Sequence, residues 1–194
     1  MELPLHLDDI RHALARIAPF INDTPVLSSA FFSSRASAAA SATRGTGITG
    51  TPSINLLLKA ESLQKTGSFK IRGATNAVRA MMESGDVLPL PDGAGVVTHS
   101  SGNHGQALAC AAAASNVKCV VVVPEGSPAV KANAARDYGA EVVYVTLFPP
   151  ASFCNILRMY CAPNLASRER VCAEMQAVTG AAFVPPYAMS LFLP

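Results

Sequence analysis

The 194-residue sequence has no tryptophan, only 6% aromatic residues and only 14% charged residues. Its 15 Lys and Arg residues against 13 Asp and Glu leave a formal charge of +2, and these charges are scattered rather than gathered into basic blocks. Nucleic-acid-binding proteins typically carry a basic patch, often with aromatic side chains that stack on bases. We therefore expect no nucleic-acid partner.

Long apolar runs are also missing, the best being the short stretch 119–123. A helix that crosses a bilayer needs about 20 consecutive apolar residues, so we expect no membrane association. The N-terminus carries Glu2, Asp8 and Asp9 where a secretory signal would have a basic segment followed by an apolar one. The expected location is the cytoplasm.

The five cysteines form no Cys-x-x-Cys pair and have no nearby histidine at the spacing of a zinc site. Their odd number favours reduced thiols over a disulfide framework. No metal site is predicted. The residues concerned are Cys110, Cys119, Cys154, Cys161 and Cys172.

From residue 56 onward, short apolar runs alternate with helical stretches. The expected strands are 56–60, 95–98, 118–124 and 141–145, and the expected helices are 69–83, 104–115 and 128–137. Continuous apolar strands that alternate with helices are typical of a parallel sheet covered on both faces. The sequence therefore predicts an α/β fold, an open twisted parallel sheet with flanking helices.

Helical periodicity also predicts an amphipathic helix over 8–18 and a last helix over 167–178. Residues 35–53 are almost entirely Ala, Ser, Thr and Gly, and we interpret them as a flexible insertion without function, because they cannot bury enough apolar surface to fix a structure. Residues 147–164 contain three prolines and show no clear period. They are interpreted as a second flexible insertion.

A first polar segment of interest, residues 63–74, leads from a predicted strand into a predicted helix. Ser68 is expected to cap this helix, with Lys70 in its first turn. The positive end of the helix dipole disfavours an ammonium group there, which suits a lysine that forms imines. On residue types alone, a solvated surface lysine is the more frequent case.

A second segment, residues 96–107, runs from a strand through a polar turn into an alanine-rich helix. The backbone N–H groups of such a turn can bind a carboxylate or phosphate, and ligands of open parallel sheets bind at the carboxyl ends of the strands. This turn combines two hydroxyls, an amide, an imidazole and two glycines, so a binding function is favoured. His104 alone would be equally consistent with a capping or core residue.

Taken together, segments 65–74 and 100–107 resemble the paired signature of fold-type II pyridoxal-phosphate enzymes, and most of all the serine racemase and threonine/serine dehydratase branch. The resemblance covers residues 8–34, 55–146 and 165–186. It implies a tryptophan synthase β-like fold, of which residues 1–194 would be the N-terminal portion. It also implies pyridoxal 5'-phosphate as cofactor, serine or threonine as substrate, and a homodimer for the full-length protein.

The resemblance implies a role for each matching residue. Lys70 would be the Schiff-base lysine and catalytic base, Phe69 would pack beside the cofactor ring, and Ser101 would be the acid/base on the opposite face. Asn103 would bond the 3-hydroxyl of the pyridine ring. The loop that holds the substrate carboxylate would comprise Ser100, Ser101, Gly102, Asn103 and His104.

Racemisation and β-elimination of the hydroxyl group, which leads to a keto acid and ammonia after hydrolysis, share their first step, so the resemblance leaves open which reaction dominates. It also implies ATP and Mg as effectors of the full-length family. The matching nucleotide positions are Ser29, Lys65, Thr66, Gln106 and Tyr138. A plain packing role for Tyr138, which precedes a glycine at a helix end, is equally consistent.

The resemblance ends at Ala188. The family's glycine-rich phosphate loop, its residue at the pyridine nitrogen and its acidic metal ligands have no match, so we expect a C-terminally incomplete fold. Lost charge-assisted hydrogen bonds, worth roughly 1.5–3 kcal/mol each, predict weak cofactor retention and impaired activity. The alternative is a catalytically inactive fragment that associates with a full-length relative through exposed apolar surface.

Overall fold

The computed structural model describes residues 5–42, 53–146, 159–160 and 165–186. Six α-helices are described, with three single-turn 3-10 helices at Ala18–Phe20, Glu61–Leu63 and Lys65–Gly67. The α-helices are α1 (Leu7–Ile17), α2 (Ala30–Ala42), α3 (Lys70–Ser84), α4 (Asn103–Ala114), α5 (Ala129–Asp137) and α6 (Leu165–Thr179). The strands are β1 (Val26–Ser28), β2 (Leu57–Lys59), β3 (Val96–His99), β4 (Cys119–Pro124), β5 (Glu141–Thr146), β6 (Met159–Tyr160) and β7 (Ala182–Phe183).

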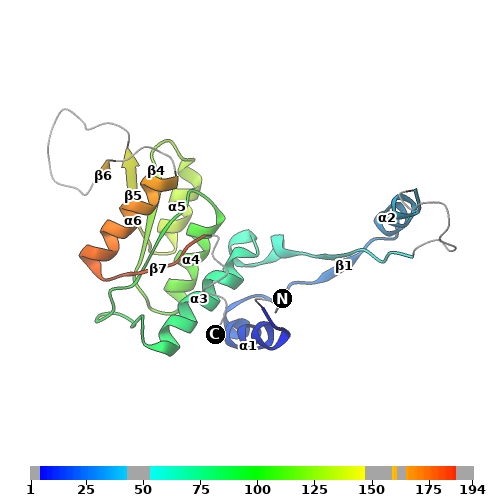
Figure 1. The fold of residues 1–194 in the computed structure, drawn as a ribbon, viewed down its shortest axis with the longest axis horizontal. Helices are drawn as coiled ribbons and strands as arrows, with labels where there is room; N and C mark the ends of the chain where they lie inside the picture. Colours follow the sequence, from blue (N-terminus) through cyan, green and yellow to red (C-terminus); the bar gives the residue numbers. More distant parts are fainter. Residues whose placement is uncertain (1–4, 43–52, 147–158, 161–164, 187–194) are drawn as a thin grey trace.

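Five strands form a parallel sheet in the order β6-β5-β4-β3-β7. The chain moves outward from β3 through β4 and β5, and later returns to place β7 on the free side of β3, where Val96 pairs with Ala182 (Figure 1). The expected strands 95–98, 118–124 and 141–145 and the helices between them are confirmed. The predicted parallel α/β sheet is therefore correct.

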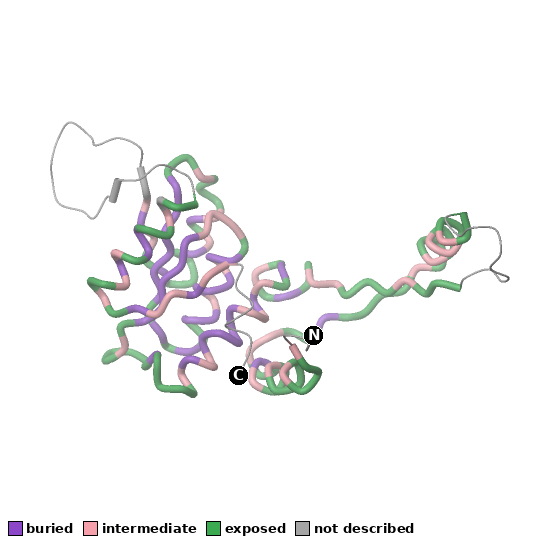
Figure 2. Tube along the Cα trace, viewed as in Figure 1, coloured by how far each residue is buried: buried purple, intermediate pink, exposed green. Residues whose placement is uncertain are grey.

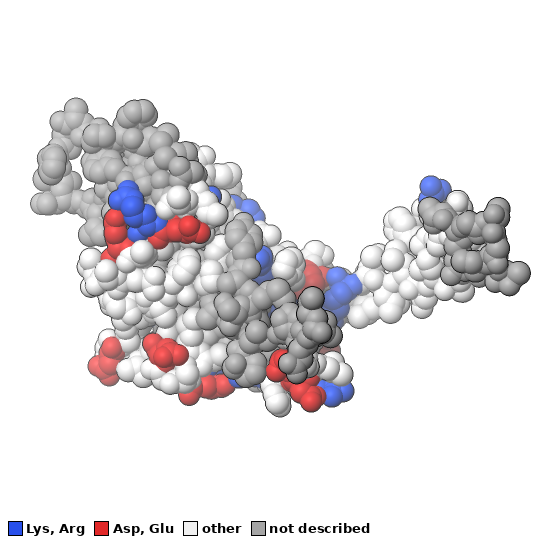
Figure 3. Space-filling model, viewed as in Figure 1, with Lys and Arg blue, Asp and Glu red and all other residues white. Residues whose placement is uncertain are grey.

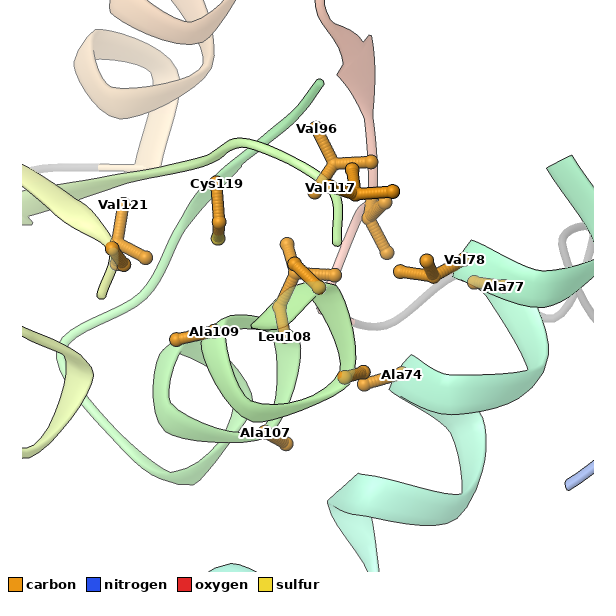
Figure 4. Packing of buried hydrophobic residues seen from close by; sticks show 14 of the residues in the cluster. Ala74, Ala77, Val78, Val96, Ala107, Leu108, Ala109, Val117, Cys119 and Val121 are labelled. Carbon is orange, nitrogen blue, oxygen red and sulfur yellow. The ribbon is translucent and has the colours of Figure 1, made fainter. Parts of the chain in front are cut away.

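Side chains of β4 alternate between two apolar layers. Cys119, Val121 and Val123 belong to the cluster that includes Leu108 of α4, whereas Val120 and Val122 belong to the cluster of α6. Figure 4 shows the first cluster, with Leu108, Val78 and Val117 gathered between α3, α4 and the sheet. Both faces of the sheet are thus covered, as continuous apolar strands require.

Alanines let α3 and α4 approach closely. Ala74 and Ala77 of α3 and Ala107 and Ala111 of α4 are all at most 2% exposed.

The amphipathic helix expected over 8–18 is confirmed as α1, and Arg16 attaches it to α3 through bonds of 2.8 Å to Glu83 Oε2 and to Asn76 Oδ1. The N-terminal helix is therefore anchored to the layer that carries Lys70.

The expected strand 56–60 forms, but its place in the parallel sheet was predicted wrongly. β2 pairs antiparallel with β1 in a separate ribbon that projects from the body of the molecule, and its side chains are exposed (Figure 1). Leu57 is 58% exposed. An apolar run does not say which element covers it, and here the neighbouring β1 takes up its backbone hydrogen bonds.

The segment interpreted as a first flexible insertion begins with regular structure. Residues 35–42 belong to α2 and residues 43–52 lie outside the described part, so the interpretation of 35–53 as a flexible insertion stays a prediction. Alanine has the highest helix propensity, and the hydroxyls of Ser37 and Ser41 donate to the carbonyls four residues earlier. No residue of α2 is buried, as Figure 2 shows, so local propensity rather than core packing accounts for this helix.

Within the second expected insertion, residues 159–160 form β6, which pairs parallel to β5. The rest of 147–164 lies outside the described residues. The helix expected over 167–178 is confirmed as α6, whereas the short strand β7 was not anticipated.

No helix among the described residues is long and apolar enough to span a bilayer. Figure 3 shows charged side chains mainly at the margins of the displayed face.

Candidate active site

The polar turn after β3 lies where the strand order of the sheet reverses. β4 flanks β3 on one side and β7 flanks it on the other, so a crevice opens at the carboxyl ends of β3 and β7. Open α/β sheets bind ligands at such a switch point. The β3 side supplies residues 99–103, and the β7 side supplies residues 184–186.

Backbone contacts shape the β3 turn. Ser100 N donates to Val122 O at 3.0 Å, and Gly102 N donates to Ser100 Oγ at 3.2 Å. A Cβ on Gly105 would lie 3.0 Å from Val121 Cγ1 and 3.2 Å from Ser100 O. Glycine at this position therefore lets the first turn of α4 lie directly against β4 and the turn.

Lys70 is the first residue of α3, as expected, but the helix cap differs from the prediction. The cap position is Phe69, and no side chain caps it. Ser68 is buried and its Oγ has no hydrogen-bond partner within the described part of the chain. The capping role of Ser68 was therefore predicted wrongly, because Phe69 already has helical dihedral angles, with φ −62° and ψ −16°, and shifts the start by one residue.

The amine of Lys70 reaches across to the β7 side of the crevice. Its Nζ donates to Pro186 O at 2.8 Å and lies 5.5 Å from the centroid of the Phe69 ring. This bond joins residues 116 positions apart. The fold thus brings Lys70 to the carboxyl edge of the sheet, beside the polar turn.

His104 is 7% exposed, and its Nε2 lies 3.1 Å from Val184 O. Since a carbonyl can only accept, Nε2 must carry the proton. Burial is the main cause that lowers the pKa of His104 to about 4, Lys70 and His99 lower it further, and the bond to Val184 acts in the opposite direction. His104 is therefore neutral near pH 7 and holds the β7 side, together with Thr98 Oγ1, which donates to the same carbonyl at 2.6 Å.

One cavity of about 250 Å³ is lined by every residue expected to contact cofactor or substrate carboxylate. The structure thus brings together two segments about thirty residues apart in sequence. The lining residues are Phe69, Lys70, His99, Ser100, Ser101, Gly102, Asn103, His104, Leu165, Arg168 and Pro186. A second cavity of about 490 Å³, mostly apolar, shares Phe69, Lys70, His104 and Pro186 with the first, so Lys70 stands where the two meet.

The nucleotide positions inferred from the resemblance lie outside this cavity. Ser29 directly precedes α2, where its Oγ accepts from Phe32 N, and Lys65 Nζ donates to Phe20 O at 2.6 Å. Tyr138 shares a side-chain hydrogen bond with Cys110, and burial is the main cause that raises the pKa of Tyr138. These contacts are all within the protein, so a nucleotide site there stays a prediction.

Helix starts give the crevice a positive electrostatic character. α1 has acidic residues in its first turn, whereas α3, α4, α5 and α6 have none. Lys70, Lys131 and Arg168 instead lie at or near the starts of α3, α5 and α6. The dipole disfavours cations at such positions by about 0.3–1 kcal/mol each. This arrangement favours an anionic ligand at the edge of the sheet.

Sequence reasoning missed three residues near the turn. Lys131 Nζ donates to Asn103 Oδ1 at 2.9 Å, and His99 and Arg168 line the cavity. His99 borders the polar turn, so its position was a usable signal. Lys131 and Arg168 come from later helices, and no local pattern marks them.

A family model described as "Pyridoxal-phosphate dependent enzyme" matches residues 18–193. The chain belongs to this family. It is 45% identical over 136 residues to a serine racemase from Dictyostelium discoideum, covering 70% of this chain and 35% of that protein. It is 31% identical over 179 residues to an L-threo-3-hydroxyaspartate ammonia-lyase from Saccharomyces cerevisiae, covering 92% and 43%.

Among solved structures, a pyridoxal 5'-phosphate-dependent aspartate racemase aligns with a TM-score of 0.73 and 37% identity, covering 99% of this chain and 48% of that one. This likeness confirms the expected fold type and the resemblance found in the two motifs. The chain spans less than half the length of each of these relatives.

The residues of the crevice fit the family's cofactor. A half-buried amine, an aromatic ring, hydroxyls and an amide surround one cavity, and helix starts without carboxylates favour the charge of a phosphate ester. Pyridoxal 5'-phosphate offers the matching groups: an aldehyde for an amine, a flat ring and anionic oxygens. This donor set is the expected one for the ring side of the cofactor.

Proposed function

We propose that this chain provides one wall of a pyridoxal-phosphate-dependent active site that racemises serine or eliminates ammonia from serine or threonine. The observation that carries the proposal is the single cavity shared by the Lys70 amine and the turn 100–103. When bound, the cofactor withdraws electrons from the α-carbon of the amino acid and makes its C–H bond acidic. The protein must then orient that bond and place proton carriers beside it.

Lys70 and Ser101 are the proposed proton carriers. The Nζ of Lys70 lies within hydrogen-bond range of a backbone acceptor, Pro186 O. As a neutral amine it would donate one N–H to that carbonyl and use its lone pair to accept the proton of the α-carbon. Ser101 lines the same cavity from the turn after β3, and its hydroxyl would return a proton on the opposite side. The N-terminal end of α4 would hold the substrate carboxylate through backbone N–H groups.

Both reaction outcomes follow from removal of the same proton. Delivery of a proton from the Ser101 hydroxyl gives the mirror-image amino acid, whereas loss of the β-hydroxyl group followed by hydrolysis gives a keto acid and ammonia. The relatives include racemases and an ammonia-lyase, which supports both outcomes. For the whole protein we further propose a homodimer, ATP and Mg as effectors, and a cytoplasmic location, all of which rest on the sequence resemblance and composition.

Borohydride trapping tests the assignment of Lys70. The purified chain is mixed with pyridoxal 5'-phosphate, its visible spectrum is recorded, and reduction is followed by mass spectrometry of the peptides. We expect a cofactor band and a reduced adduct on Lys70 that are lost in Lys70→Ala and kept in Lys118→Ala, a half-exposed lysine at the start of β4. An adduct spread over surface lysines, or one that survives Lys70→Ala, would refute the assignment.

A second candidate function is favoured by one observation, the apolar cavity of about 490 Å³ between α1, α3 and residues 184–186. Ile10, Leu14 and Phe69 line it and are 51%, 52% and 60% exposed. Exposed apolar surface of this kind promotes association. The proposed occupant is a longer chain of the same family, because such chains hold more than half their residues outside the region matched here.

Light scattering on mixtures with Dictyostelium serine racemase would test this candidate. We expect a complex that Leu14→Glu abolishes, because a buried carboxylate would be desolvated, and that Arg11→Glu, on the exposed side of α1, preserves. A chain that remains monomeric beside the full-length relative would refute the interaction.

A further inference from the structure

Lys131 lies in the first turn of α5, an electrostatically unfavourable position for a cation. It is the third residue of this helix. Its Nζ reaches α4 and donates to Asn103 Oδ1 at 2.9 Å. The bond links two consecutive βαβ units at the carboxyl edge of the sheet, and it ends on a residue that lines the 250 Å³ cavity.

An ammonium group fixes the orientation of the amide that it contacts. Lysine offers three donors and no acceptor, whereas the asparagine side chain has one acceptor oxygen and one NH₂ donor. If the amide were flipped, its NH₂ group would face the ammonium, donor against donor. With Oδ1 held by Lys131, the NH₂ group is what Asn103 can offer to a ligand in the cavity.

We propose that Lys131 is a positioning residue that makes Asn103 a hydrogen-bond donor toward an anionic oxygen of the ligand. The inference rests on the proposed function, in which that oxygen is the ring oxygen of pyridoxal 5'-phosphate. Lys131 is not among the residues that line the cavity, so it acts through Asn103 and not by contact with the ligand. Its charge also polarises the amide, which strengthens the NH₂ group as a donor.

Two other cations, Lys70 and Arg168, line the same cavity. Lys70 Nζ donates to Pro186 O on the β7 side, and Arg168 lies near the start of α6, which packs on the opposite face of the sheet from α4. Lys131 is the cation that donates a hydrogen bond to the Asn103 amide oxygen. Loss of this contact would leave the amide free to rotate and to present its oxygen, an acceptor, to an anion.

A double-mutant cycle on cofactor binding tests the proposal. The dissociation constant for pyridoxal 5'-phosphate and the position of its visible band are measured at one pH for four chains: the wild type, Lys131→Met, Asn103→Ala and the double variant. We expect Lys131→Met to weaken binding about tenfold, equivalent to ~1.4 kcal/mol, and to shift the band, since protonation of the ring oxygen changes the spectrum. In the Asn103→Ala background, Lys131→Met should add almost nothing.

Two controls separate positioning from general charge and folding effects. Lys131→Arg keeps a donor-only cation and should retain wild-type affinity within about threefold, equivalent to ~0.7 kcal/mol. Lys118→Met removes the same charge at the opposite end of β4 and should leave affinity and band unchanged. Far-ultraviolet circular dichroism verifies the fold of each variant.

The outcomes distinguish this inference from the proposed function. A Lys70-dependent band that Lys131→Met leaves unaltered, or an effect of Lys131→Met that persists in full without Asn103, would overturn the positioning role alone. Absence of any Lys70-dependent band in the wild-type chain would overturn the proposed function, and the role of Lys131 with it.

Discussion

Glu61 should make the stability of this chain depend on acid. Arg72 holds its carboxylate with two bonds, Nε to Oε2 at 2.8 Å and Nη2 to Oε1 at 2.7 Å, and Thr24 Oγ1 donates to Oε1 at 2.7 Å. The hydrogen bonds from Arg72 are the main cause that lowers the pKa of Glu61 from 4.5 to about 2, with burial opposing them. The pair joins α3, just after Lys70, to the start of the projecting ribbon.

The magnitude follows from the linkage between proton binding and folding. Each pKa unit corresponds to 1.36 kcal/mol, so the full shift sets an upper limit of about 3.4 kcal/mol. Side-chain exposures of 19% for Glu61 and 27% for Arg72 admit solvent screening, which reduces the expected contribution to about 1–2 kcal/mol. Because the folded pKa lies below the unfolded one, this stability is present above pH 4.5 and is lost as the pH falls toward 2.

Urea unfolding followed by circular dichroism at pH 7 and pH 3 measures the effect. The wild type should lose about 1 kcal/mol more than Glu61→Gln between these pH values, and Arg72→Met should behave like Glu61→Gln. Glu141→Gln is the matched control, because Glu141 is 57% exposed and lies 3.8 Å from Lys118. An equal acid sensitivity of the wild type and Glu61→Gln would refute the reasoning.

Three further predictions concern the layer around the polar turn. Leu108→Ala should lower the unfolding free energy by about 2–5 kcal/mol in urea titrations, because Leu108 is 0% exposed. Leu88 is 51% exposed, so Leu88→Ala should change the unfolding free energy by less than about 0.5 kcal/mol. Equal losses in the two variants would contradict the core assignment. Gly105→Ala gains about 1 kcal/mol of helix propensity, but its Cβ would lie 3.0 Å from Val121 Cγ1, and overpacking costs about 1–3 kcal/mol. We therefore expect a net loss of unfolding free energy that Val121→Ala partly restores. A stabilised Gly105→Ala variant would show that the contact relaxes freely. In a histidine NMR titration, His104 should titrate near pH 4 rather than 6.5. Because its pKa is lower in the folded state than in the unfolded state, its contribution to stability is present above pH 6.5 and is lost as the pH falls through 4. A midpoint near 6.5 would disprove its burial.

Most of the parallel sheet was predictable because β4 is buried on both faces. Val120 to Val123 form a continuous apolar run, all at most 2% exposed, and only a covered parallel strand tolerates such a run. The same logic misplaced β2, because Leu57 and Leu58 are equally apolar but exposed. Apolar residues in sequence record a preference for burial, whereas the element that covers them is set by long-range packing.

The candidate site likewise has features that residue types reveal and features that only long-range packing sets. The turn 100–103 could be found from sequence, since its polar and glycine residues stand together after an apolar strand, and Lys70 was correctly placed at the start of a helix. Lys131 could not be found, because its significance depends on an atom 28 residues earlier in the chain. Residue types identify a candidate ligand group, while the groups that orient it come from whichever helices the topology brings to the same edge.

Contacts on the β7 side indicate how the crevice can accept a ligand without rearranging. Thr98 and His104 both bond to Val184 O from buried positions, so they hold that segment in place whatever occupies the cavity. Lys70 bonds two residues further on, to Pro186 O, from a half-buried position. A carbonyl offers the lysine only a partial negative charge, whereas the oxygens of an anionic ligand would offer a full one. An entering anionic ligand would therefore compete with Pro186 O for Lys70, and the two buried bonds to Val184 O preserve the β3–β7 edge on which the site is built.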